Sequence, residues 1–105
     1  MVIAIVGSSK FKPWMLEKAK ELELEGNVAI LSHLFSHADG YELTEDQFKN
    51  AVQNGHDRID MCEMLYVVAP DNYIGESTQE EIDYAKRKGK IIKVWTGPGF
   101  LDKEV

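Results

Sequence analysis

The chain has 105 residues, which is enough for one domain with a hydrophobic core and too few for a second. Twelve basic and eighteen acidic residues give a net charge of −6, so the overall charge attracts neither a nucleic acid polymer nor an anionic membrane. Cys62 is the only cysteine, which excludes an internal disulfide bond, and no apolar run is long enough to cross a membrane. Met1 leads into an apolar run without a basic segment or a cleavage site, so we expect a soluble cytoplasmic protein.

The first third of the chain predicts a strand, a helix and a second strand. The continuous apolar run over residues 2–6 is typical of a strand covered on both faces. A helix is expected to begin near Pro13 and to end at Gly26, because apolar residues recur at helical spacing between them. A second strand is expected over residues 27–32. Together the three elements indicate a right-handed βαβ unit.

Residues 33–43 show no periodicity and are interpreted as a functional loop. The side chains of His33, His37 and Tyr41 are candidates to cover an aromatic ring of a ligand. The two histidines are four residues apart, which would suit a metal only on a helix and with a third ligand. We therefore predict no metal site.

Thr44 and Gln47 have the spacing of a capping box and predict the start of a helix. We expect the chain to turn at Asn54-Gly55 and to start a new helix with Asn54 as its N-cap. His56 and Asp57 would then lie at a helix N-terminus beside the sheet. The alternative is one long helix to Glu63.

The second half predicts two more strands around a polar loop and a helix. Strands are expected over residues 64–69 and 90–95, and residues 96–105 are expected to form a tail or an edge element. Between the strands, Ser77 and Glu80 have capping-box spacing, which would place Glu81 in the first turn of a helix. The partial positive charge of a helix N-terminus favours an ionised carboxylate there. The simpler interpretation is that these acidic residues have no role in a site, because acidic residues are common at the N-terminus of any helix.

Strands that alternate with helices predict a single α/β domain over residues 1–105. We expect about four strands in the order 2-1-3-4, in an open parallel sheet of the Rossmann-like or flavodoxin-like kind with helices on both faces. Ligands of such sheets bind beyond the carboxyl ends of the strands, where successive connections go to opposite faces. Gly7, Ser8 and Ser9 would meet residues 71–77 at that point. The three residues could hold a phosphate or a sugar, or could form an ordinary turn.

Several segments of the second half match a known family. The matching segments are His56 to Asp60, Tyr66 to Ala69, Tyr73 to Thr78, Glu80 to Lys86, and Gly89-Lys90. They resemble the nucleoside 2-deoxyribosyltransferase-like family, in particular a small bacterial and phage subgroup related to deoxynucleoside N-glycoside hydrolases. The motif at the end of the family's site, a glutamate followed by an aliphatic residue, any residue, an aromatic residue and alanine, falls on Glu81 to Ala85.

The resemblance implies cleavage of an N-glycosidic bond, or exchange of the base, on a small (deoxy)nucleoside or nucleotide. Glu81 would be the nucleophile, and Asp57 or Asp60 would orient the sugar or assist proton transfer. The substrate-binding residues would be Gly7, Ser8, Ser9, His56, Tyr73, Gly75, Ser77 and Thr78. We expect no cofactor, and a homodimer by resemblance alone. The alternative is a nucleotide-binding sensor or regulatory module without turnover.

Overall fold

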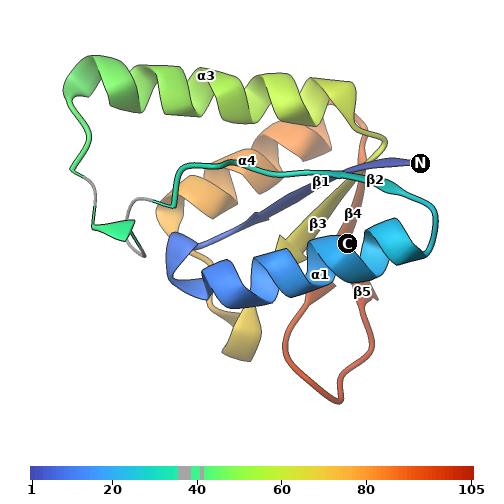
Figure 1. Ribbon diagram of the computed structural model, residues 1–105. Coiled ribbons are helices and arrows are strands. Elements are labelled where there is room, and N and C mark those ends of the chain that lie inside the picture. Colours follow the sequence, from blue (N-terminus) through green and yellow to red (C-terminus); the bar gives the residue numbers. More distant parts are fainter. Residues whose placement is uncertain (36–38, 41) are drawn as a thin grey trace.

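The computed structural model describes residues 1–35, 39–40 and 42–105. Within these residues, five strands form one sheet in the order β2-β1-β3-β4-β5 (Figure 1). The elements in chain order are β1 (Val2–Gly7), η1 (Ser9–Phe11), α1 (Lys12–Leu24), β2 (Val28–Ile30), α3 (Glu45–Met61), β3 (Met64–Val68), η2 (Pro70–Asn72), α4 (Glu76–Arg87), β4 (Ile91–Trp95) and β5 (Lys103–Glu104). The helices of this part of the chain include none that is long and apolar enough to span a membrane.

The sheet is mainly parallel, as expected. β1 pairs in parallel with β2 and β3, and β3 pairs in parallel with β4, so the predicted order of the first four strands is confirmed. The sheet has five strands and not the four expected, because part of the 96–105 segment forms β5, which pairs antiparallel with β4. A hydrogen bond of 2.9 Å from the Tyr66 hydroxyl to the Asp102 carboxylate helps to tie this segment to the sheet.

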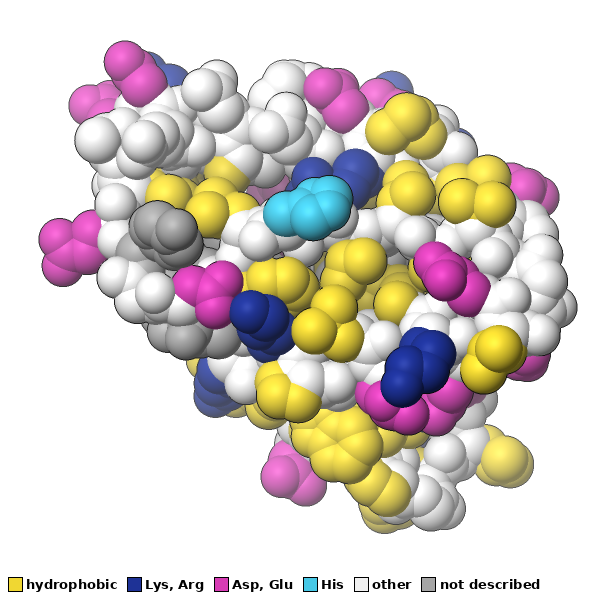
Figure 2. All heavy atoms as spheres, viewed as in Figure 1, with side chains coloured by type: hydrophobic (Ala, Val, Ile, Leu, Met, Phe, Trp, Pro, Cys, Tyr) yellow, Lys and Arg dark blue, Asp and Glu magenta, His cyan; other side chains and the backbone are white. Residues whose placement is uncertain are grey.

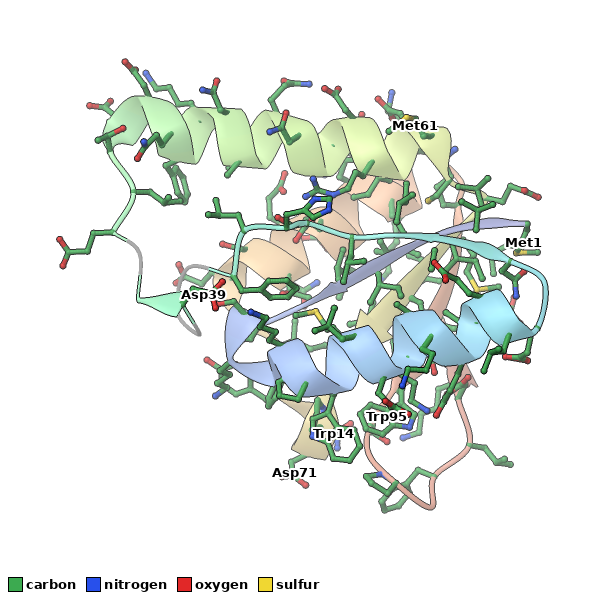
Figure 3. All side chains as sticks on the ribbon, in the orientation of Figure 1. Met1, Trp14, Asp39, Met61, Asp71 and Trp95 are labelled. Atoms are coloured by element: carbon green, nitrogen blue, oxygen red, sulfur yellow. The ribbon has the colours of Figure 1, made fainter. Side chains whose placement is uncertain are left out.

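Helices cover both faces of the sheet, which explains why its central strands are continuously apolar. In β1, Ile3 and Ile5 face α1, where they pack in one cluster with Met15. Ala4 and Val6 belong to a second cluster, to which α3 and α4 contribute Ile59, Ile82 and Ala85. Figure 1 shows α1 on one side of the sheet and α3 and α4 on the other. Trp14 and Trp95 lie side by side, with ring centroids 5.1 Å apart (Figure 3).

Helix α3 is one continuous helix, so the predicted turn at Asn54-Gly55 is wrong and the alternative of a single helix is right. Its start is as predicted: Thr44 Oγ1 accepts the Gln47 backbone N–H at 3.2 Å, and the Gln47 side chain accepts the Thr44 N–H at 3.0 Å. Gly55 keeps helical geometry and is buried inside α3. His56 and Asp57 therefore lie well inside a helix and not at an N-terminus.

Helix α4 begins two residues earlier than predicted. Gly75 is its N-cap, with extended backbone geometry, and no side chain caps the helix, so the predicted Ser77–Glu80 capping box is wrong. The Gln79 N–H donates to the Gly75 carbonyl at 2.9 Å and closes the first turn. Glu81 consequently lies in the second turn, where the helix N-terminus has little effect on its charge.

The end of β1 approaches β3 so closely that residue 7 must be glycine. A Cβ on Gly7 would stand 2.7 Å from the carbonyl oxygen of Val68. The absence of a side chain at position 7 lets the end of β1 lie directly against the end of β3, at the edge where the chain is expected to bind a ligand.

We predict that Gly7→Ala lowers the free energy of unfolding by about 1–3 kcal/mol, because the added methyl group forces two paired strands apart. Urea denaturation measures this. Gly75→Ala is the control, since a Cβ there meets nothing closer than 3.9 Å and the backbone φ is −75°. It should lose only the difference between glycine and alanine as an N-cap, about 0.5–1 kcal/mol. Equal stability of the two variants would contradict the prediction.

Candidate functional site

The carboxyl ends of β1 and β3 lie side by side, and the chain leaves them toward opposite faces of the sheet. β1 leads into α1 on one face, and β3 leads through η2 into α4 on the other. Two hollows open at this edge, and both are lined by Gly7, Ser9 and Glu81. The structure thus brings together the two segments that the sequence selected for ligand contact.

The larger hollow is an open groove of about 600 Å³. Its lining residues are Gly7, Ser8, Ser9, Leu43, Phe48, Tyr73, Gly75, Glu76, Ser77, Thr78 and Glu81. Polar groups come from the loop after β1 and from the start of α4, and the apolar side chains come from more distant parts of the chain. The space-filling view shows hydrophobic side chains across the middle of one face, with lysine and arginine side chains among them (Figure 2).

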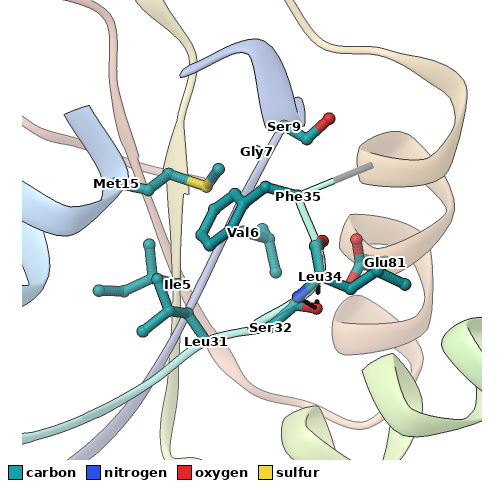
Figure 4. Close-up of a pocket in the computed structure, with 10 residues that line it drawn as sticks. All are labelled: Ile5, Val6, Gly7, Ser9, Met15, Leu31, Ser32, Leu34, Phe35 and Glu81. Atoms are coloured by element: carbon teal, nitrogen blue, oxygen red, sulfur yellow. Dashed lines mark hydrogen bonds between the residues drawn. The ribbon is translucent and has the colours of Figure 1, made fainter. Parts of the chain in front are cut away.

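The smaller hollow is a pocket of about 60 Å³ (Figure 4). Glu81 lines both this pocket and the groove. Apart from Glu81, its polar side chains are Ser9 and Ser32, and the rest of its wall is mainly apolar. In the close-up, Glu81 enters from α4 on the side opposite Ile5 and Met15. One carboxylate therefore borders a polar groove and an apolar pocket.

The environment of Glu81 favours its protonated form. The pKa of its carboxyl is raised from 4.5 to about 7, mainly by burial and to a smaller extent by the negative charge of the neighbouring Glu80. The positive charge of Arg58 opposes this rise, as does His56. The sequence predicted an ionised carboxylate at a helix N-terminus, whereas Glu81 lies two residues further into α4 than predicted and burial has the largest effect on its pKa.

The other two predicted carboxylates, Asp57 and Asp60, do not line either hollow. Asp57 is exposed and accepts a hydrogen bond of 2.9 Å from the Gln53 side chain. Asp60, also exposed, accepts one of 2.8 Å from the Tyr84 hydroxyl.

His56 also lies outside the linings of the groove and the pocket. Its ring stacks on that of Tyr84, with centroids 3.9 Å apart, and its Nε2 is 2.7 Å from Glu80 Oε1. His56 therefore contacts Glu80 and Tyr84 of α4, and its charge lowers the pKa of Glu81 from outside the groove.

Tyr73 lines the groove, and Lys10 lies against its ring. Lys10 Nζ lies 3.3 Å from the centroid of the Tyr73 ring, and Phe11 meets the same ring edge to face at 5.8 Å. Lys12, the other lysine near this loop, is engaged in an ion pair with Asp39 at 2.9 Å. Lys10 is consequently the cation held beside the groove by an aromatic ring.

Sequence analysis missed several residues of the site. Phe48, in the first turn of α3, is 53% exposed and lines the groove. Phe35, which closes the small pocket, was also missed. The sequence left open whether Glu76 or Glu81 faces the crevice, and both line the groove. His33 is exposed, and His37 and Tyr41 fall outside the described residues, so their predicted role as ligand contacts is untested.

Within residues 1–35, 39–40 and 42–105, no group of three histidine, cysteine, aspartate or glutamate side chains could hold a metal ion. Comparison of the chain with protein-family models, with curated proteins and with solved structures found no significant match. The chemistry of the site therefore has to be argued from its geometry and from the sequence motifs.

We predict that Glu81→Gln removes a pH-dependent loss of stability. A carboxyl whose pKa is raised by folding stabilises the protein fully below pH 4.5, and this contribution is lost as the pH rises through 7. Between pH 4 and pH 8, the free energy of unfolding of the wild type should fall by up to about 3 kcal/mol relative to that of the glutamine variant. Urea denaturation at both pH values measures the difference. If the difference in free energy of unfolding between the two proteins is the same at both pH values, the pKa of Glu81 is not raised by burial.

Proposed function

We propose that this chain cleaves or exchanges the N-glycosidic bond of a small (deoxy)nucleoside or nucleotide, with Glu81 as the nucleophile. The observation that carries the proposal is the half-buried Glu81 carboxylate at the junction of the groove and the pocket. The motif from Glu81 to Ala85 supports it through the family resemblance. The strand order 2-1-3-4 agrees with a flavodoxin-like relationship, which we propose as the finer description of the fold.

The groove offers complementary groups for each part of such a ligand. The hydroxyls of Ser8 and Ser9 can bind sugar or phosphate oxygens, and the backbone N–H groups in the first turn of α4, which no N-cap side chain binds, suit an anion. Leu43, Phe48 and Tyr73 supply apolar and aromatic surface for a base.

The proposed reaction has two steps, as in retaining glycosidases. A Glu81 oxygen attacks C1′ of the sugar and forms an ester while the C1′–N bond breaks, and its electron pair leaves with the base, which takes up a proton. Water then attacks C1′, the ester C–O bond breaks, and the carboxylate is regenerated as the water loses a proton. In base exchange, a ring nitrogen of a second base replaces the water.

A second carboxylate is useful for orienting the sugar or for moving a proton. The resemblance implies Asp57 or Asp60, but neither lines the groove, whereas Glu76 does. We therefore propose Glu76 as the second carboxylate and assign Asp60 to the support of Tyr84, with which it is hydrogen-bonded. A homodimer, as the resemblance implies, is part of the same proposal.

We predict that wild-type protein releases free base from at least one member of a panel of nucleosides, their monophosphates and NAD, as measured by chromatography. Glu81→Gln should lower the rate at least about 10³-fold, because the nucleophile is lost while the shape of the side chain is kept. Glu80→Gln is the matched control, since it removes the neighbouring carboxylate and should change the rate only a few-fold.

The outcomes separate two functions. Saturable binding of one nucleotide by both wild type and Glu81→Gln, without any release of base, would overturn the enzyme proposal and favour a nucleotide-binding sensor or regulatory module. Equal release by both proteins would exclude Glu81 as the nucleophile.

We further predict that kcat/KM rises with pH up to a plateau above the pKa of Glu81, which is about 7. Only the ionised carboxylate can attack C1′, and kcat/KM reports the ionisation of the free protein. Initial rates between pH 5 and pH 9 measure this profile. A rate that falls through pH 7 would instead assign Glu81 the role of a general acid.

A further inference from the structure

A buried glycine lies in the middle of the 17-residue helix α3. Glycine destabilises a helix interior relative to alanine, because it loses more conformational freedom on folding. Gly55 is not placed there for an unusual backbone angle, since its φ is not positive. The reason must therefore be space.

The space beside Gly55 is occupied by the carboxylate of Glu81. A Cβ at position 55 would stand 3.0 Å from Glu81 Oε2, which is tighter than most contacts of a Cβ, and 3.7 Å from Glu81 Cδ, which is an ordinary contact. The carboxylate thus lies against the bare backbone of α3, although its own helix is α4. A methyl group at position 55 would require the carboxylate to shift by a few tenths of an ångström, and a larger side chain would displace it.

Arg58, almost one turn further along α3, borders the same space. Its Nη2 lies 3.9 Å from the position of the absent Cβ. Arg58 forms no direct ion pair with the residues that the structure describes, and its charge lowers the pKa of Glu81. The other charged groups that act on Glu81 are His56 from α3, which lowers its pKa, and Glu80 from α4, which raises it.

We infer that Gly55 and Arg58 are positioning residues for Glu81. The missing side chain at position 55 lets the carboxylate lie near the Arg58 guanidinium, which favours its ionised form at the edge of the groove. This role in catalysis rests on the proposed function, whereas the placement of the carboxylate does not. The competing explanation is that Gly55 only allows α3 and α4 to pack closely, in which case the Arg58 charge would act on Glu81 whatever residue occupies position 55.

The test follows the titration of the Glu81 side-chain carboxyl by ¹³C NMR in a double-mutant cycle. Arg58→Gln should raise the pKa of Glu81 in the wild-type background. Arg58→Lys keeps the positive charge and should leave the pKa of Glu81 close to its wild-type value. In Gly55→Leu, the leucine side chain displaces the carboxylate, so the effect of Arg58→Gln should be largely lost. Asn54→Leu is the matched control, because Asn54 is exposed and lines neither the groove nor the small pocket, and it should leave the effect of Arg58→Gln intact.

An effect of Arg58→Gln that is equally large in Gly55→Leu, or absent in the wild type, would overturn the inference. Gly55→Ala takes the place of Gly55→Leu if the larger variant does not fold, and it should reduce the effect partially. Where base is released, kcat/KM at pH 7 should fall about 10- to 100-fold in Gly55→Leu, as expected for a misplaced reacting group, but only slightly in Asn54→Leu. If no base is released, the proposed function fails while the titration still decides the placement of Glu81.

Discussion

The parallel pairing of β1 with β3 is the constraint on which the candidate site depends. Gly7 is in register with Val68, and a side chain at position 7 would collide with the Val68 carbonyl. The two strand ends are therefore held together while the following helices diverge to opposite faces of the sheet. The groove and the small pocket both lie at this divergence, and Gly7 lines both.

The packing of α3 on α4 determines the electrostatic environment of the Glu81 carboxyl. Glu81 extends from α4 toward α3 and loses much of its contact with water, which raises its pKa to about 7. Such a shift destabilises the folded protein at neutral pH, and a pKa near the working pH is typical of catalytic carboxyls. Arg58 limits the shift. The balance of burial and charge leaves a carboxylate that can ionise at neutral pH next to a ligand-sized groove.

Much of the sheet could be predicted from the sequence, because continuous apolar runs such as residues 2–6 mark buried parallel strands wherever they occur. The strand order and the meeting of Gly7–Ser9 with the start of α4 followed from the rules of parallel topology. Local signals failed at two positions. Asn54-Gly55 has the composition of a turn, but Gly55 serves a contact with a residue 26 positions away. Ser77 and Glu80 have capping spacing, but Gly75 begins the helix earlier.

The same limit explains the errors within the site. Phe48 and Glu76 line the groove because of tertiary placement, and helical spacing alone could not separate them from core or surface positions. Asp57 and Asp60 are close in sequence to Gly55 and Arg58, yet both project away from the groove lining to bond Gln53 and Tyr84. A long helix presents different faces at successive residues, so a one-residue offset separates a site residue from a surface residue.

The most direct test of the central claim is to trap the covalent intermediate. The substrate is a nucleoside with fluorine at C2′ and an activated leaving base. The fluorine slows both steps of a two-step glycosyl transfer, and the activated base keeps the first step fast enough for the intermediate to accumulate. Intact-protein mass spectrometry followed by peptide mapping should then find one sugar on Glu81, and no adduct on the Glu81→Gln variant. An adduct on another residue, or base release without any adduct, would contradict a nucleophilic Glu81.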